Sequence, residues 1–77
     1  MQLGTRWNLG AEPPSRVPDA VVTAIRAVEA AHAAEDTAHW RWTLTWLEGR
    51  PVVELDATGE TVRLGADGSV TVSPAED

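Results

Sequence analysis

The second half of the chain alternates between apolar and polar residues with a period of two. Four runs show this pattern: residues 39–48, 51–57, 61–64 and 70–72. Between them lie turn-forming sequences, among them Glu48-Gly49-Arg50-Pro51 and Gly65-Ala66-Asp67-Gly68, that suit hairpin connections. The pattern predicts an antiparallel meander with one buried and one solvated face. The expected inward residues are Trp40, Trp42, Leu44, Trp46, Val53, Leu55, Ala57, Val62, Leu64, Val70 and Val72.

The segment before the meander follows the spacing of a helix. After Pro18 it contains neither glycine nor proline as far as Ala38. Pro18 suits a first helical position, and Asp19 suits the positive end of the helix dipole. We expect one helix from Pro18 to about Ala38. Its apolar stripe consists of Val17, Val21, Ala24, Ile25, Val28 and Ala31.

Residues 2–9 also alternate, with Leu3, Trp7 and Leu9 apolar, and predict a short half-buried strand. The cluster at residues 10–15 predicts a loop. The place of this first strand in the sheet stays open. Together these elements predict a two-layer α+β sandwich, one long helix on a mostly antiparallel sheet of four to five strands, in the order β-α-β-β-β-β. We expect a single domain over residues 1–73 and a disordered acidic tail over residues 74–77.

Composition narrows the classes of function. The chain has 77 residues and lacks lysine, cysteine, tyrosine and phenylalanine, which excludes disulfide scaffolds, thiolate zinc sites and several catalytic nucleophiles. Its serines and glycines form no nucleophile or phosphate-binding motif, so we expect neither an enzyme nor a cofactor. A net charge of −6 disfavours nucleic acid and anionic membranes as partners. The acidic residues are scattered and interleaved with arginine, which disfavours mimicry of DNA. The N-terminal sequence lacks an apolar run of signal-peptide length, which makes the cytoplasm the expected location.

Tryptophan is the main aromatic residue, and its positions have two interpretations. Trp40, Trp42 and Trp46 alternate along one predicted strand, and Trp7 falls on the inward side of another. A row of indoles can stack on a sugar or an unpaired base. We favour the other interpretation, a core built on indoles, because the helical stripe needs an apolar sheet face as its partner.

A polar cluster near the predicted end of the helix is a candidate metal site. His32, Asp36 and His39 have the spacing i, i+4 and i+7, which would place three ligands for a divalent transition metal on one helical face. The alternative is a solvated helix end, with the histidines near the negative end of the dipole. We prefer this alternative.

The polar face of the predicted sheet is a candidate surface for partner binding. A chain this short buries a modest share of its surface, so a partner would add stability. We therefore expect a small accessory, regulatory or inhibitory module that binds another protein or its own copy. The alternative is a structural subunit of a homo-oligomeric assembly, such as that of a phage. The candidate binding residues are Arg41, Thr43, Thr45, Glu54, Asp56, Arg63 and Thr71.

Overall fold

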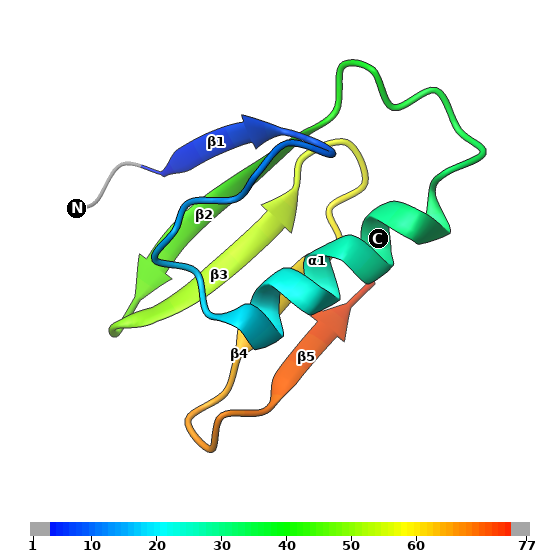
Figure 1. Ribbon diagram of the computed structural model, residues 1–77. Coiled ribbons are helices and arrows are strands. Elements are labelled where there is room, and N and C mark those ends of the chain that lie inside the picture. Colours follow the sequence, from blue (N-terminus) through cyan, green and yellow to red (C-terminus); the bar gives the residue numbers. More distant parts are fainter. Residues whose placement is uncertain (1–3, 75–77) are drawn as a thin grey trace.

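A computed structural model describes residues 4–74, which form one helix and a five-stranded antiparallel sheet (Figure 1). This confirms the predicted α+β class and the order β-α-β-β-β-β. Most of the predicted acidic tail, and residues 2 and 3 of the first predicted strand, lie outside the described residues. The elements are β1 (Thr5–Asn8), α1 (Asp19–Ala31), β2 (Arg41–Leu47), β3 (Arg50–Leu55), β4 (Thr61–Leu64) and β5 (Val70–Ser73).

The strands lie in the sheet in the order of the chain, from β1 to β5. β1 pairs antiparallel with β2, with Trp7 opposite Trp42, so the first strand takes the edge next to the tryptophan strand. β2 and β3 are joined by the two-residue turn Glu48–Gly49, in which both residues have positive φ (54° and 78°). Primed hairpin turns of this kind match the twist of paired strands.

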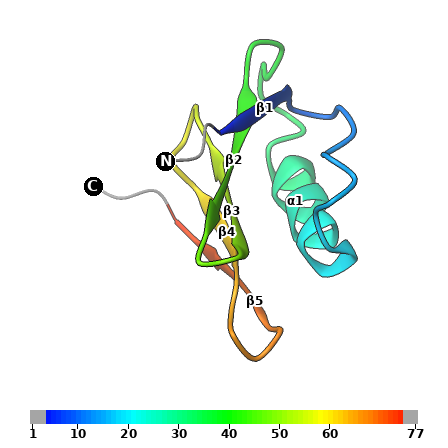
Figure 2. The same cartoon turned by 90° about the vertical axis from the view of Figure 1, so that its left-hand side faces the viewer.

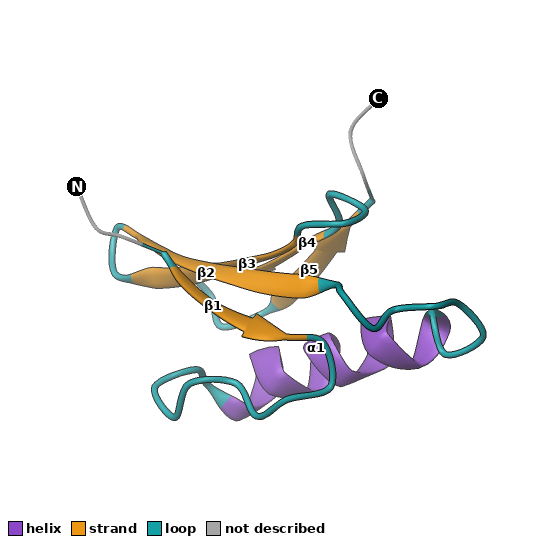
Figure 3. Ribbon diagram, turned by 90° about the horizontal axis from the view of Figure 1, so that it is seen from above, coloured by secondary structure: helices purple, strands orange, loops and turns teal. Residues whose placement is uncertain are grey.

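The core lies between α1 and the tryptophan-bearing face of the sheet. Figures 2 and 3 show the helix on one side of the sheet only. Trp42 is completely buried, while Trp7, Trp40 and Trp46 are partly buried and pack against the same cluster, which agrees with a core built on indoles. The buried apolar residues are Val17, Val21, Ile25, Val28, Trp42, Leu44, Val53, Leu55 and Val62.

The helix is shorter than the sequence predicts, because it ends at Ala31 and not near Ala38. At its end the N–H groups of His32 and Ala33 bond to the carbonyls of Glu29 and Ala30, three residues back, which tightens the last turn. The His32 ring then bonds to Glu60 in the β3–β4 turn, which fixes the chain where it leaves the helix. Within residues 4–74 there is no helix that is long and apolar enough to cross a membrane.

Three smaller expectations were wrong at element ends. Pro18 is the N-cap, with extended backbone angles, and is not the first helical residue. The predicted strand at residues 39–48 begins only at Arg41, because the loop that follows the shortened helix continues through Trp40. Ala57 is exposed in a turn, because β3 ends at Leu55. Beyond that point the backbone N–H groups of Thr58 and Gly59 donate to the carbonyl of Leu55.

Candidate interaction face of the sheet

The side of the sheet opposite α1, here called the outer face, is covered by no other element within residues 4–74 (Figure 2). Strand register fixes its members, because residues opposite one another in the ladder share a face. All seven of the predicted binding residues lie on it. The outer face consists of Arg6, Asn8, Arg41, Thr43, Thr45, Leu47, Arg50, Val52, Glu54, Asp56, Thr61, Arg63, Thr71 and Ser73.

At the β1 end of the outer face, Asp56 gathers its neighbours into a bonded group. Arg6 Nη2 lies 2.5 Å from Asp56 Oδ2, and Thr43 Oγ1 donates to Oδ1 at 2.8 Å. The backbone N–H of Asp56 donates to the carbonyl of Arg41 at 2.9 Å. Partial burial works against the charge of Asp56, but the bonds from Arg6 and Thr43 outweigh it and lower the pKa of the carboxyl. Asp56 therefore compensates the charge of Arg6.

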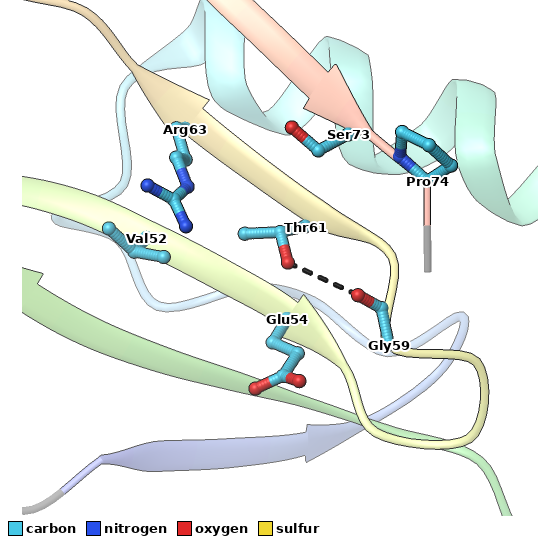
Figure 4. Close-up of a pocket in the computed structure, with 7 residues that line it drawn as sticks. All are labelled: Val52, Glu54, Gly59, Thr61, Arg63, Ser73 and Pro74. Atoms are coloured by element: carbon cyan, nitrogen blue, oxygen red, sulfur yellow. Dashed lines mark hydrogen bonds between the residues drawn. The ribbon is translucent and has the colours of Figure 1, made fainter. Parts of the chain in front are cut away.

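Over β3, β4 and β5 the outer face is hollowed. One hollow has a volume of about 480 Å³, and a second, of about 310 Å³, adjoins it toward the β2–β3 turn. Val52 and Arg63 lie opposite one another in the ladder and line both hollows. In Figure 4 the Arg63 side chain extends from β4 toward Val52, with Thr61 and Glu54 farther along the same two strands.

Sequence reasoning missed several residues of the outer face. Leu47 is 58% exposed there, and Val52 lines both hollows. The turn sequence at residues 48–51 predicts a turn position for Arg50, whereas Arg50 is the first residue of β3. Thr61 and Ser73, which also line the first hollow, lie opposite one another in the ladder. The same period-two parity that identified Thr43 and Arg63 also assigns these residues to this side, so the signal was present.

The proposed metal ligands do not gather in the structure. Because α1 ends at Ala31, His32, Asp36 and His39 share no helical face, which removes the geometry on which that hypothesis depended. Within residues 4–74, no group of three histidine or acidic side chains is placed to hold a metal ion. His39 is exposed in the loop before β2.

His32 instead forms a bonded link between the end of the helix and the β3–β4 turn. Its Nδ1 lies 2.5 Å from Glu35 Oε2, and its Nε2 lies 2.6 Å from Glu60 Oε1. The Trp40 ring packs edge-on against the imidazole, with ring centroids 5.2 Å apart. Hydrogen bonds to Glu35 and Glu60 raise the pKa of His32. Both ring nitrogens face a carboxylate, and only the imidazolium can donate to both.

Glu29 is a second structural residue that the sequence did not single out. Its side chain is only 10% exposed, and its Oε2 accepts bonds from Trp42 Nε1 at 3.0 Å and from the Gly10 N–H at 2.9 Å. Its Oε1 lies 2.8 Å from Arg26 Nη1. One carboxylate therefore connects the helix, the tryptophan strand and the loop that follows β1.

The chain matches no protein-family model, no curated protein and no solved structure. Its function is therefore inferred from its own residues and their geometry.

Proposed function

We propose that this protein acts by binding another protein through the outer face, as a small accessory, regulatory or inhibitory module. One observation carries the proposal. The helix covers one side of a five-stranded sheet, and within residues 4–74 the other side has no cover. That side combines hollows, exposed apolar groups and arginines in one continuous surface.

The apolar members distinguish this surface from an ordinary solvated sheet face. A two-layer domain commonly exposes a polar face to water. Here Leu47 is 58% exposed, and it lines a hollow together with Val52 and the arginines at positions 50 and 63. Arginine is enriched at protein interfaces, where apolar groups at the centre are surrounded by polar ones. A partner that filled the two hollows would bury Leu47 and Val52 together.

A second candidate is self-association through the edge of the sheet. β5 is the last strand of the sheet within the described residues, and its Val72 is 46% exposed on the side that faces α1. A free strand edge can pair with the same edge of another copy. This arrangement would suit a structural subunit of a homo-oligomer. Sedimentation to a defined oligomer as the concentration rises would favour it over a one-to-one binder.

Site-specific photo-crosslinking tests the main proposal. A photoreactive residue is placed at Thr45 or Thr71 on the outer face and, as a control, at the exposed Thr23 of α1. We expect one discrete crosslinked partner from Thr45 and Thr71 in the native cells, and none from Thr23. A product with twice the mass of the chain would identify a second copy as the partner. Crosslinks from Thr23 alone, or from none of the three positions, would contradict the proposal.

A further inference from the structure

The arginines of this acidic protein are concentrated on one surface. Of the six basic residues in the chain, all of which are arginine, four lie on the outer face. Among residues 4–74, that face carries two carboxylates, Glu54 and Asp56, so these residues give it a formal excess of two positive charges, whereas the whole chain has a net charge of −6. The four arginines are Arg6, Arg41, Arg50 and Arg63.

Strand alternation causes this separation of charge. Arginines and acidic residues are interleaved along the chain, but each arginine in a strand falls on the outward parity. Most carboxylates within the described residues lie instead on the helix or in turns, for example Glu29, Glu48 and Asp67. The fold therefore produces a local basic surface that the linear sequence conceals.

Two of the four arginines already have an anionic partner. Arg6 bonds to Asp56, and Arg50 Nη2 lies 3.4 Å from Glu48 Oε1. Arg41 and Arg63 form no ion pair within residues 4–74. Arg63 lines both hollows and lies opposite Thr71 in the ladder.

Hydroxyl groups add possible donors near Arg63. Ser73 lines the first hollow with it, and Thr71 lines the second, whereas the Thr61 hydroxyl already donates to the carbonyl of Gly59. A guanidinium with nearby hydroxyls matches the planar, two-oxygen geometry of a carboxylate.

We infer that the outer face binds an acidic segment of a protein, with carboxylates directed at Arg63 and apolar side chains against Val52 and Leu47. This inference rests on the proposed function and adds the chemistry of the partner. Complementary charge at the point of contact gives such a surface its selectivity. A nucleic acid strand fits less well, because it carries a negative charge at every nucleotide. A protein segment can direct its few carboxylates at Arg63 and away from Glu54, which lines the first hollow.

The test uses peptides of defined charge and the full chain. A ten-residue peptide rich in glutamate, with two leucines, is titrated into isotopically labelled protein, and amide shifts are followed by NMR. A lysine-containing peptide of the same length and a single-stranded oligonucleotide are titrated in parallel. We expect saturable shifts centred on Arg63, Val52 and Thr71 with the acidic peptide alone, and weaker binding as salt increases.

Two variants that each remove one positive charge test whether the acidic peptide binds at Arg63. Arg63→Gln should weaken binding of the acidic peptide by about two- to fivefold, the range of a single exposed ion pair. Arg16→Gln is the matched control, because Arg16 packs over Trp46 on the helix side, and it should leave binding unchanged. Thermal melting of both variants verifies that they are folded.

The outcomes separate this inference from the proposed function. Tighter binding of the oligonucleotide, or equal effects of the two variants, would overturn the acidic-segment inference. If crosslinking at Thr45 and Thr71 still captured a discrete protein, the proposed function would stand although the acidic-segment inference had failed. If the acidic peptide bound at Arg63 but crosslinking captured no partner, the preference of the outer face for carboxylates would be supported and the proposed function would fail.

Discussion

Trp42 lies at the centre of the core, where its ring has no solvent exposure and its indole N–H bonds to Glu29. We expect Trp42→Ala to lower the free energy of unfolding by about 3–5 kcal/mol, because the substitution leaves a large cavity. That loss is comparable with the whole stability of a small domain. Leu47→Ala is the matched control at an exposed apolar position and should cost less than about 0.5 kcal/mol. Denaturant unfolding measures both, and a loss below 1 kcal/mol for Trp42→Ala would contradict its place in the core.

The link through His32 predicts how stability changes with pH. The pKa of His32 is raised in the folded protein. Its contribution to the free energy of unfolding is therefore complete below the ordinary pKa of 6.5 and is lost as pH rises through the raised pKa. The pKa of Glu60 is lowered, because bonds from His32 and Thr58 outweigh the opposing effect of partial burial. The Glu60 contribution is therefore complete above its ordinary value of 4.5 and is lost as pH falls. Both contributions are present together between about pH 5 and 6.

Melting temperature measured from pH 5 to 9 tests this link. The unmodified protein should lose stability as pH rises above the ordinary histidine pKa of 6.5, and His32→Gln should remove most of that dependence. His39→Gln is the control, since His39 is exposed, and it should retain the dependence of the unmodified chain. The same pH profile in His32→Gln and in the unmodified protein would show that His32 carries no such link.

At the scale of elements, Glu29 connects three parts of the chain that are separate in sequence. Glu29→Ala leaves the buried N–H of Trp42 without its partner and releases the Gly10 N–H, so we expect a loss of about 1–3 kcal/mol in the free energy of unfolding. Hydrogen exchange at the Gly10 amide should accelerate in the same variant. Glu12→Ala, at an exposed loop position, is the control and should change neither quantity. Retention of Gly10 protection in Glu29→Ala would refute the connection.

The elements differ in how far the sequence predicted them. Period-two runs with turn signals identified the four strands of the meander, because alternation and a hairpin turn are both local properties. The sequence predicted the end of the helix too far along the chain, because residues 32–38 contain no glycine or proline. The His32 ring bonds instead to Glu60, 28 residues away, a contact that local sequence does not reveal. The position of β1 was undetermined for a similar reason: its pairing of Trp7 with Trp42 joins segments 35 residues apart, and alternation alone does not specify partners.

The same limit applies to the candidate site. Parity placed Thr43, Thr45 and Arg63 on the outer face, because a strand exposes alternate residues whatever its neighbours are. Parity did not show that Val52 and Arg63 line the same two hollows, since that depends on the register of β3 against β4. The grouping of positive charge was also hidden, because net charge averages over both sides of the molecule.

At the scale of the whole molecule, the sheet has one covered face and one open face. Helix α1 and the loop before it cover the indole-bearing face, and the arginine-bearing face stays open (Figure 3). Every proposal above depends on this division, because a covered outer face could bind no partner. The chain contains no cysteine, so single cysteines can report on either face without a background thiol.

The most direct measurement is the rate of thiol labelling of two single-cysteine variants in the isolated protein. Thr45→Cys lies on the outer face, and Val53→Cys lies in the core, where the native valine has no solvent exposure. We predict that Thr45→Cys reacts at nearly the rate of an unfolded peptide, and that Val53→Cys reacts at least about a hundredfold more slowly, because labelling there requires unfolding. Similar rates at the two positions, or protection at Thr45→Cys in a dilute monomer, would contradict the division into a covered and an open face.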